Sequence, residues 1–516
     1  MKIVTVSEMR RLEATAMKRD ADNRVDGISG ADMMNVAGRG AAHCIMQWIE
    51  GWPASQRQRF VVLAGKGNNG GDAWVAARVL DQTFSMDVTL YSVCDIDDLT
   101  GDAKYHADIA NHVVDARDGV EELPPEALES GTIIVDGLLG TGLKGAPKGA
   151  YKKIIQQVNE SGLPVVALDV PSGLDADTGD GAEAIQADMT VTMCFPKQGM
   201  FLKDGPAVCG RIEVVGIDLP MDLFDSAKPI GEAIGADDAR RLVKRRRGDG
   251  YKGTYGHLLV LGGSGGYVGA PILSALGGIR GGAGLVTLCV PGGCLANPPL
   301  ASLIFRRLGT AADGCFKASM AEDLYTLLYN KTAVAYGPGT GEEAEPQILE
   351  KLLETNLPLV IDADGLRLLA KHPQMLPRKQ GETVLTPHLG EMQALMKGFG
   401  LDETAPKETQ AVELAKRTGC VVVLKGRFSI VADPSGRMTL NMSGGPALST
   451  AGSGDVLTGV IGALLAQGMA AADAARLGVY VHGAAGDLWK GAKRAMSADD
   501  LADLVSDAWL KVSMIC

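Results

Sequence analysis

Residues 60–72, Phe-Val-Val-Leu-Ala-Gly-Lys-Gly-Asn-Asn-Gly-Gly-Asp, decide the fold class of this chain. The first part is a short apolar run typical of a buried strand, and glycines at positions 65, 67 and 70 interrupt it. The next apolar residues fall on one face of a helix: Val75, Ala76, Val79 and Leu80. This strand, turn and helix match the G-x-G-x-x-G pattern, in which the backbone can approach a pyrophosphate. The stretch therefore predicts an α/β fold with a ligand loop, although no clear acidic residue follows about 20 positions later.

Short β-branched runs alternate with helical patterns along the whole chain, which is typical of parallel sheets with crossover helices. The predicted strands of the first half are Phe60–Ala64, Val88–Tyr91, Thr132–Val135, Val165–Leu168, Thr190–Met193 and Arg211–Val215. Those of the second half are His257–Leu261, Leu285–Val290, Ala333–Tyr336, Leu359–Ile361, Val421–Leu424 and Ser429–Ala432. At 516 residues the chain is too long for one core. We expect two three-layer αβα domains, residues 1–225 and 241–516, joined by a linker at 226–240.

The composition restricts the class of protein. Apolar residues make up 46% and charged residues 22%, as in ordinary globular proteins. The net charge of −12 argues against nucleic acid or an anionic membrane as the main partner. The nine cysteines are odd in number and include no Cys-x-x-Cys pair, which favours reduced thiols. No signal peptide or membrane span is evident. We expect a soluble, cytoplasmic protein.

Polar residues follow three predicted strands of the first half at the point where each strand ends. The segments are 65–72, 136–146 and 169–175, and each joins an aspartate (Asp72, Asp136 or Asp169) to glycines. Ligands of doubly wound sheets bind in the crevice at the carboxyl ends of the strands. Each aspartate could instead cap only the turn or helix beside it. Three such ends with glycines favour one shared site.

These segments resemble a known family. Lys-Gly-Asn-Asn-Gly-Gly-Asp (66–72), Val-Asp-Gly-Leu-Leu-Gly-Thr-Gly (135–142) and Leu-Asp-Val-Pro-Ser-Gly-Leu-Asp (168–175) are similar to motifs of the YjeF N-terminal domain, the NAD(P)HX epimerase family. The likeness covers roughly residues 1–220 and includes several motifs in the right order. It implies a Rossmann-like domain whose ligand is NAD(P)HX, the hydrated form of NADH or NADPH.

The resemblance also implies roles for individual residues. Epimerising the hydrated ring carbon needs proton transfer, for which Asp169 and Lys144 are the available pair. A potassium ion would be held by Asn69, Asp136 and Ser172, since hard oxygen donors suit an alkali cation. The implied substrate contacts are Asn68, Asn69, Gly70, Gly71, Asp72, Gly140, Thr141, Gly142, Leu143, Lys144, Gly145, Ala146 and Asp169.

Residues 449–455, Ser-Thr-Ala-Gly-Ser-Gly-Asp, carry the strongest functional signal of the second half. Apolar residues at helical spacing follow them, and Gly468 ends the run. Free N–H groups at such a helix N-terminus attract anions, above all phosphate. Asp455 could remove a proton from a hydroxyl beside that phosphate. The alternative is a charge that only stabilises the helix, but a cap needs no group of glycines.

Several other segments of the second half stand out, and most of them follow predicted strands. Among them are 262–270, 337–341, 362–366, 386–392 and 423–426. Lys425 ends an apolar strand, where a charge is costly unless it meets an anion such as a nucleotide phosphate. His388 follows Pro387, and a single histidine in a loop is more often structural than functional. No Gly-x-x-x-x-Gly-Lys-Ser/Thr motif is present, which argues against a P-loop ATPase.

This ordered set resembles the ribokinase-like superfamily and, within it, the ADP/ATP-dependent NAD(P)HX dehydratases, over roughly residues 240–510. The resemblance implies that Asp455 deprotonates the hydroxyl of the hydrated ring, which is phosphorylated and then eliminated as phosphate. The implied contacts with the hydrated dinucleotide are Ala270, Gly339, His388 and Asp455. Those implied for the adenine nucleotide are Lys425, Gly426, Arg427, Phe428, Ser429 and Gly454.

The leading hypothesis is therefore a bifunctional enzyme that repairs nicotinamide nucleotides. It would use NADHX or NADPHX, K+ in the first half, and ADP or ATP with Mg2+ in the second, and we expect a homo-oligomer. ADP is favoured as phosphoryl donor, since fusions of these two domains resemble bacterial enzymes that generally use it. The nearest rival is a ribokinase-type kinase of small molecules with a non-catalytic N-terminal dinucleotide-binding module. An NAD-dependent dehydrogenase is less favoured, because the acidic residue expected after the glycine loop is missing.

Overall fold

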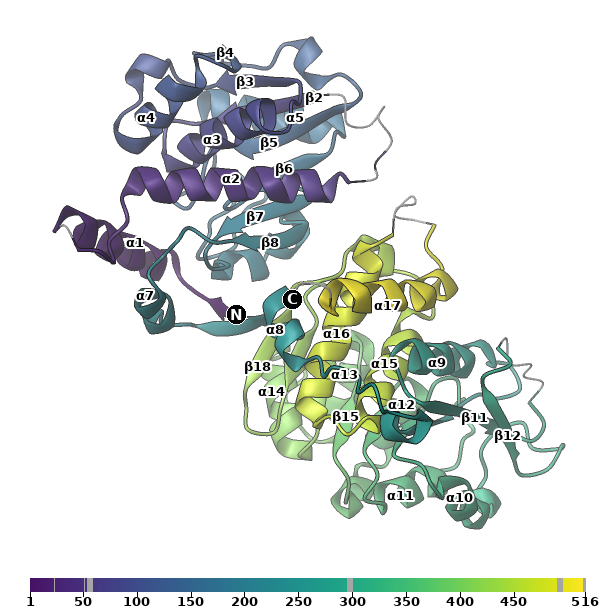
Figure 1. Cartoon of the computed structure of the whole chain (residues 1–516). Coiled ribbons are helices and arrows are strands. Elements are labelled where there is room, and N and C mark those ends of the chain that lie inside the picture. Colours follow the sequence, from purple (N-terminus) through teal and green to yellow (C-terminus); the bar gives the residue numbers. More distant parts are fainter. Residues whose placement is uncertain (23, 51, 53–58, 295–299, 490–494, 514–516) are drawn as a thin grey trace. The chain divides into compact units, whose positions relative to one another are not determined.

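The computed structural model describes residues 1–22, 24–50, 52, 59–294, 300–489 and 495–513. Its contacts divide the chain into two units, Met1–Glu232 and Ala233–Cys516, both drawn in Figure 1. The segment 226–240 contains the strand β9 (Gly231–Ile234) and the start of the helix α8 (Ala236–Leu242). It is thus a folded segment at the boundary.

The first unit contains a parallel sheet in the order β4-β3-β2-β5-β6-β7-β8. The short strand β1 does not belong to this sheet and pairs antiparallel with Gly231 and Glu232. The strands are β1 (Lys2–Ile3), β2 (Arg59–Ala64), β3 (Val88–Ser92), β4 (Asp115–Arg117), β5 (Thr132–Gly137), β6 (Val165–Leu168), β7 (Met189–Met193) and β8 (Arg211–Val215).

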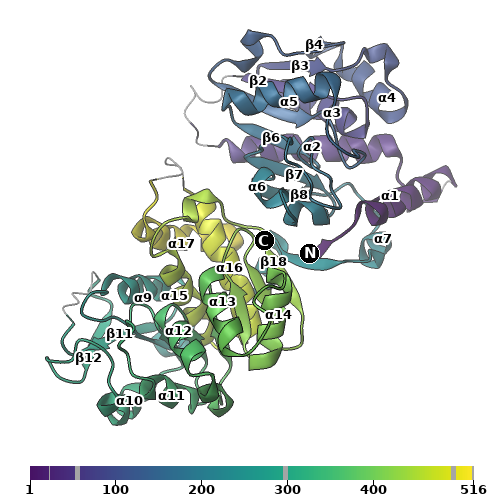
Figure 2. The same cartoon turned by 180° about the vertical axis from the view of Figure 1, so that it is seen from behind.

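Helices cover both faces of this sheet, as Figures 1 and 2 show for α2 and α5. Side chains alternate along a strand, so that Phe60 and Val62 of β2 pack with α2 and α3, while Val61 and Leu63 pack with α5. This alternation produces the αβα layers. The helices are α1 (Val6–Ala21), α2 (Gly30–Trp48), α3 (Asn68–Gln82), α4 (Gly101–Ala110), α5 (Gly149–Ser161), α6 (Gly205–Val208) and α7 (Met221–Ser226).

The second unit contains a mixed sheet in the order β9-β18-β17-β16-β15-β14-β13-β10-β11-β12. Its pairs from β16 to β12 are parallel, whereas β16, β17 and β18 pair antiparallel. Besides β9, the strands are β10 (His257–Leu261), β11 (Leu285–Pro291), β12 (Ile304–Leu308), β13 (Ala333–Tyr336), β14 (Leu359–Ile361), β15 (Thr383–Leu385), β16 (Val421–Leu424), β17 (Ile430–Ala432) and β18 (Met438–Asn441).

A central helix, α15 (Ser453–Ala466), forms much of the core of the second unit. It is buried from Val456 to Ala466, which fits a helix that is apolar on all sides. The helices α9, α16 and α17 belong to the same core cluster as α15. Besides α8 and α15, the helices are α9 (Gly269–Arg280), α10 (Ala321–Leu328), α11 (Gln347–Leu353), α12 (Asp364–Lys371), α13 (Leu389–Gly398), α14 (Lys407–Thr418), α16 (Ala471–Asp487) and α17 (Ala498–Ser513).

All the strands predicted from the sequence are present, with ends that differ by a residue or two. Two expectations need correction. The helix α3 begins at Asn68, so residues 68–72 form its first turns and are not part of the loop. The strand β17 is antiparallel to β16, because the connection 425–429 is too short for a parallel crossover.

Two predictions from composition concern cysteines and membranes. The cysteines in the described part of the chain are all free thiols, as predicted. No helix among the described residues has both the length and the apolar character needed to span a bilayer.

Gly459→Ala should destabilise the second unit. In an open helix alanine would be favoured over glycine by about 1 kcal/mol. Here, however, a Cβ would overlap the carbonyl oxygen of Ser274 on α9. Overpacking of this kind costs about 1–3 kcal/mol, so we expect a lower midpoint of urea unfolding. Gly314→Ala is the control, because no atom lies within 4 Å of the added Cβ. An unchanged midpoint for Gly459→Ala would mean that α9 and α15 separate without cost.

Candidate functional site

Asp136, at the end of β5, organises a buried polar cluster in the first unit. Its carboxylate accepts hydrogen bonds from the Ser172 N–H (2.8 Å), the Ser172 hydroxyl (2.6 Å) and the Leu138 N–H (3.2 Å). Burial raises the pKa of Asp136 to about 6, against the lowering effect of these hydrogen bonds. The Leu139 N–H donates to the Ser172 hydroxyl (2.8 Å). The loop after β5 is therefore tied to the turn after β6.

Asn69, in the first turn of α3, lies at the same cluster. Its amide nitrogen donates to the Leu139 carbonyl (2.9 Å), which also lies 3.1 Å from the Ser172 hydroxyl. The Asn69 Oδ1 is buried and has no hydrogen-bond partner among the described residues. An unpaired carbonyl oxygen near a hydroxyl and a buried carboxylate fits a hard cation such as K+. The structure thus brings together the three predicted ligands, Asn69, Asp136 and Ser172.

A second polar group surrounds Asp169, which follows β6 with a left-handed φ of 61°. Such a backbone conformation is uncommon outside glycine and tends to occur at functional sites. The Asp169 Oδ1 forms an ion pair with Lys197, a buried lysine to which the sequence motifs assign no role. It also accepts hydrogen bonds from the Thr192 hydroxyl and the Met193 N–H, both at 3.2 Å.

Two further carboxylates interact with this ion pair. Burial raises the pKa of Asp72 well above its usual value, and Asp169 and Glu13 raise it further. Burial also raises the pKa of Glu13, on α1, against the lowering effect of Lys197. Asp72 and Asp169 were both predicted as site residues. Glu13 and Lys197 were missed, because nothing in their local sequence indicates that they meet Asp169.

The glycine loop after β5 begins against α3 and ends exposed. A Cβ on Gly140 would lie 3.1 Å from the Asn69 Cβ, so these two predicted residues are neighbours. The Thr141 carbonyl accepts a hydrogen bond from Arg10 (3.1 Å). Lys144 is exposed, and the described hydrogen bonds and ion pairs include none from its ammonium group. Asp169 therefore meets Lys197, not Lys144, in this structure.

In the second unit, Asp455 lies in the first turn of α15. The helix begins after Gly452, whose φ of 88° is left-handed and favours glycine. No described side chain caps this helix start, so N–H groups of its first turn are available to an anion. Burial raises the pKa of Asp455 to about 7, and the nearby Asp362 raises it while Lys425 lowers it. A carboxyl group of this kind can take up a proton near neutral pH.

Lys425 and Asp362 form a buried ion pair beside Asp455. The Lys425 Nζ lies 2.7 Å from the Asp362 Oδ1 and 3.8 Å from the Glu391 Oε2. The other Asp362 oxygen accepts a hydrogen bond from the Thr458 hydroxyl of α15 (2.6 Å). Burial alone would lower the pKa of Lys425, but Asp362 and Glu391 outweigh it and the pKa lies above its usual value.

Glu391 also connects His388 to this group. The His388 Nδ1 accepts hydrogen bonds from the N–H groups of Gly390 (3.0 Å) and Glu391 (3.3 Å) at the start of α13. In return the Glu391 carboxylate accepts a hydrogen bond from the His388 N–H (2.8 Å). This is a reciprocal capping box. The His388 Nε2 lies 3.3 Å from the Glu391 Oε1, and the His388 side chain is 52% exposed.

The other two predicted contacts of the second unit lie side by side. Gly339 has a left-handed φ of 65°, and a Cβ there would lie 3.4 Å from the Ala270 Cβ. Ala270 is in the first turn of α9. Further along α9, the Ser274 hydroxyl donates to the Asp455 carbonyl (2.9 Å). The helix that carries Ala270 is therefore fixed to the helix that carries Asp455.

The predicted nucleotide segment 425–429 joins β16 to β17. A Cβ on Gly454 would lie 3.2 Å from the Lys425 Nζ, so these two residues are neighbours. The Arg427 guanidinium lies 4.1 Å from the centre of the Phe428 ring and bonds to the Gly444 carbonyl. Ser429 bonds back to Gly426 across the turn (3.2 Å). The segment thus reaches the loop ahead of α15.

Three buried residues near Asp455 were given no role from sequence. Asp362 and Glu391 lie in the segments 362–366 and 386–392, which were noted as strand ends. His482, on α16, lies 2.9 Å from the Ser453 carbonyl and 3.1 Å from its hydroxyl. Burial lowers the pKa of His482 to about 4, so it is neutral at pH 7 and holds the start of α15.

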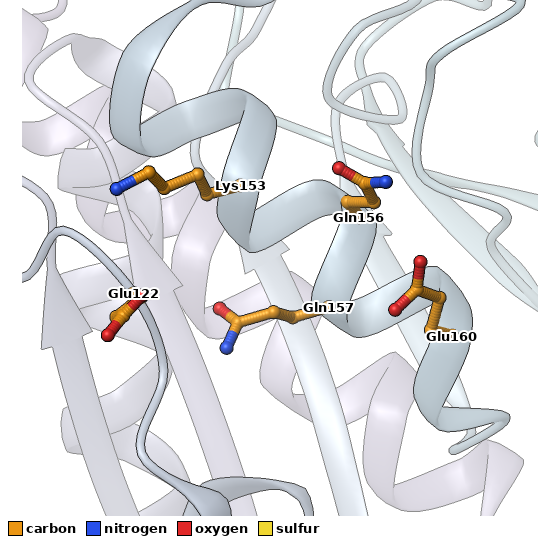
Figure 3. A pocket seen from close by; sticks show the side chains of 5 residues that line it. All are labelled: Glu122, Lys153, Gln156, Gln157 and Glu160. Atoms are coloured by element: carbon orange, nitrogen blue, oxygen red, sulfur yellow. The ribbon is translucent and has the colours of Figure 1, made fainter.

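A shallow pocket also lies on the surface of the first unit, away from these clusters. Figure 3 shows the side chains that line it: Lys153, Gln156, Gln157 and Glu160 from α5, and Glu122 from the segment ahead of β5. The Gln157 side chain bonds to the Leu123 backbone at 2.8 and 3.0 Å, which is a structural role. None of the predicted site residues lines this pocket.

The chain matches two family models, and it aligns with relatives over nearly its whole length. The model described as "YjeF-related protein N-terminus" matches residues 30–199, and the one described as "NAD(P)H-hydrate dehydratase" matches residues 258–507. The bifunctional NAD(P)H-hydrate repair enzyme Nnr of Coxiella burnetii is 35% identical over 504 residues, with 96% of each chain covered. The enzyme of the same name from Moorella thermoacetica is 34% identical over 517 residues, covering 98% of this chain and 96% of that one.

A solved structure, the ADP/ATP-dependent NAD(P)H-hydrate dehydratase from Bacillus subtilis, is 30% identical with a TM-score of 0.49. It covers 55% of this chain and 99% of its own. The fold and the two family matches define a two-domain α/β protein that joins a YjeF-related unit to a unit of the NAD(P)H-hydrate dehydratase type, as the sequence predicted. The chain belongs to the family of bifunctional NAD(P)H-hydrate repair enzymes.

Proposed function

We propose that the chain repairs hydrated NADH and NADPH, with epimerisation in the first unit and nucleotide-dependent dehydration in the second. The observation that carries the dehydration is Asp455, a buried carboxyl with a pKa raised to about 7 at the start of α15. A base needs a pKa near the working pH, and a phosphoryl group needs positive charge beside it. The names of the relatives supply the substrate class.

The dehydration follows from this arrangement. Asp455 would accept the proton of the ring hydroxyl while the hydroxyl oxygen forms a bond to the terminal phosphorus of the nucleotide. The bond from that phosphorus to the bridging oxygen breaks, the nucleotide leaves with one phosphate fewer, and the N–H groups at the start of α15 would hold the phosphoryl charge. Phosphate then leaves the ring carbon and the neighbouring ring carbon loses a proton, which restores the double bond of the reduced nicotinamide. Ala270, Gly339 and His388 would contact the dinucleotide around Asp455.

The adenine nucleotide supplies the phosphoryl group, with Mg2+ to offset its charge. Segment 425–429 and Gly454 would hold it. Lys425 supports this role, because its cation lies between the segment and the start of α15. ADP is favoured over ATP, since bacterial fusions of these two domains generally use it.

The epimerase site would occupy the crevice at the ends of β2, β5 and β6. Asn68 to Asp72 and Gly140 to Ala146 would bind NAD(P)HX. Asp169 would transfer a proton at the hydrated ring carbon, and the exposed Lys144 would be the second group of the pair.

Potassium would bind at Asn69, Asp136 and Ser172, where the unpaired Asn69 Oδ1 supports a cation. Epimer exchange should therefore slow by about tenfold or more when choline chloride replaces potassium chloride. Asn69→Ala should raise the K+ concentration that is needed for half of the maximal exchange rate. Exchange that is indifferent to K+ in both proteins would remove the cation from the site.

The pH dependence of dehydration tests the role of Asp455. The base must be ionised, and its pKa is raised to about 7, so kcat/KM should rise as the pH increases through 7. We expect a value about tenfold lower at pH 6 than at pH 8. The same measurement on epimer exchange in the first unit is the control. A dehydration profile that is flat between those pH values would show that another group is the base.

The function as a whole is tested with a mixture of both NAD(P)HX epimers and either ADP or ATP, by following the absorbance of reduced nicotinamide. Full recovery is expected with at least one of the nucleotides. No recovery with either would overturn the proposal, and recovery of the S epimer alone would remove the epimerase. A phosphorylated product that accumulates without elimination would favour the small-molecule kinase.

A further inference from the structure

Lys197 is the most buried charged side chain of the first unit that the proposed reaction does not use. It is 1% exposed and lies just after β7, ahead of the 3-10 helix Gln198–Phe201. Its ammonium group donates to the Asp169 Oδ1, the Thr192 hydroxyl (3.0 Å) and the Met193 carbonyl (3.0 Å). An ammonium group has three protons. All three are therefore committed, and Lys197 has none left for a ligand.

The hydrogen bonds of Asp169 are asymmetric. The Lys197 ammonium, the Thr192 hydroxyl and the Met193 N–H all donate to its Oδ1. Among the described residues, no hydrogen bond or ion pair reaches its Oδ2. The side chain is 15% exposed, so it is close to solvent on one side. One oxygen is thus anchored, and the other is open to accept a proton from a ligand.

The surroundings make this ion pair unlike a surface one. A lone buried ammonium would be costly, and only the carboxylate and its further acceptors offset that cost. The other titratable groups that interact with Lys197 or Asp169 are Glu13 of α1, Asp72 of α3 and Cys194, and Arg10 of α1 in turn interacts with Glu13. The pKa values of Glu13 and Asp72 are both raised, first by burial. Asp169 is therefore the carboxylate that pairs directly with the Lys197 cation.

We propose that Lys197 is a positioning residue for epimerisation, which fixes the Asp169 carboxylate so that its Oδ2 faces the hydrated ring carbon. The inference rests on the proposed epimerase function of the first unit. Lys197 acts through Asp169 and does not touch the substrate. The competing explanation is that Lys197 only ties the end of β7 to the end of β6.

A double-mutant cycle in the full-length chain separates the two explanations. Lys197→Met should lower the kcat of epimer exchange by about 100-fold and change its KM by less than about threefold. Asp169→Asn should lower kcat at least as much. The double variant should be no slower than Asp169→Asn alone, because both changes remove the same function. Losses that multiply in the double variant would show that Lys197 does not act through Asp169.

A pH profile and two further variants complete the test. In Lys197→Met the low-pH limb of the exchange rate should move to higher pH, because Asp169 has lost its cation. Thr192→Val keeps the side-chain volume but removes the hydroxyl that bonds to both Lys197 and Asp169. It should lower the exchange rate by about tenfold, a smaller loss than that of Lys197→Met. This variant keeps the test possible if Lys197→Met does not fold. Lys152→Met, at an exposed lysine paired with Glu183, is the matched control and should keep the full rate.

The outcomes distinguish the inference from the function on which it rests. If the wild-type chain does not exchange the epimers, the proposed epimerase fails. If the wild type exchanges them and both Lys197→Met and Thr192→Val keep the wild-type rate and pH profile, the positioning role is overturned.

Discussion

Asp455→Asn should abolish dehydration of NAD(P)HX while epimer exchange continues at the wild-type rate. Asparagine keeps the shape of the side chain but cannot accept the hydroxyl proton. Loss of a general base costs about 10²–10⁴-fold in rate. We expect a fall in kcat of at least about 10³, because the neighbouring Asp362 is already bound to Lys425 and Thr458. The measurement is recovery of reduced nicotinamide from the S epimer, with epimer exchange followed separately by chromatography.

The same variant should not lose stability. The raised pKa of Asp455 means that the folded protein disfavours its charge, first because of burial. A neutral amide should therefore be tolerated at least as well, and at about pH 8 the unfolding midpoint should stay level or rise. If Asp455→Asn loses dehydration but keeps its unfolding midpoint, the defect lies in the catalytic step and not in the folding of the unit.

Asp473→Asn is the matched control for Asp455→Asn. Asp473 is also in the first turn of a helix of the second unit, but its side chain is 43% exposed and pairs with Arg476 (3.3 Å). This control should keep full dehydration. If Asp455→Asn stopped both activities, the chain would have one shared site, and if it stopped neither, Asp455 would not be the base.

The parts of the fold that were predicted from sequence are the buried ones. Runs such as Val421–Leu424 are apolar at every position, because helices or other strands cover both faces. Most of the strands that were missed lie at sheet edges, as β4 and β12 do, or have only two or three residues, as β1 and β15 do. In Ile304–Leu308 the residues Arg306 and Arg307 are exposed, as is common at an edge strand that must not pair with another chain.

The candidate site was predictable where residues close in sequence act together. The glycines before Asp455 indicated a helix N-terminus, and the structure has one there. Lys197 and Asp362 were missed because each acts through a residue distant in sequence. Lys197 is 28 residues from Asp169, and Asp362 is 63 residues from Lys425. A buried charge is informative only when its partner is known, and the partner comes from the fold.

The two units use their cations differently. In the first, Lys197 pairs with the proposed catalytic Asp169 itself. In the second, Lys425 pairs with Asp362, so the proposed base Asp455 is left without the closest counter-ion. The pKa of Asp455 is accordingly raised, by burial first and then by Asp362. A buried carboxylate without a direct cation partner is in this way tuned toward neutral pH.

Lys425→Met should strongly destabilise the second unit. Methionine has a similar length, but its loss of charge leaves Asp362, which is 1% exposed, and the buried Glu391 without their cation. Removing one partner of a buried ion pair costs about 3–5 kcal/mol. It should also raise the pKa of Asp455 above about 7, because Lys425 lowers it in the wild type. Dehydration at about pH 7 should then fall through the loss of ionised base as well as weaker nucleotide binding.

Calorimetry of the full-length chain would measure this loss. Gly459→Ala, which should destabilise the second unit, identifies the unfolding transition that belongs to that unit. Lys351→Met is the control, because its pair with Glu354 is exposed and such pairs contribute only about 0–1 kcal/mol. Adding Asp362→Asn to Lys425→Met should restore part of the stability, since the unpaired buried charge is then gone. It should not restore dehydration, because the cation beside the nucleotide segment is still missing. A Lys425→Met transition within about 1 kcal/mol of the wild type would show that solvent already reaches Asp362 and that the ion pair does not hold the start of α15 in place.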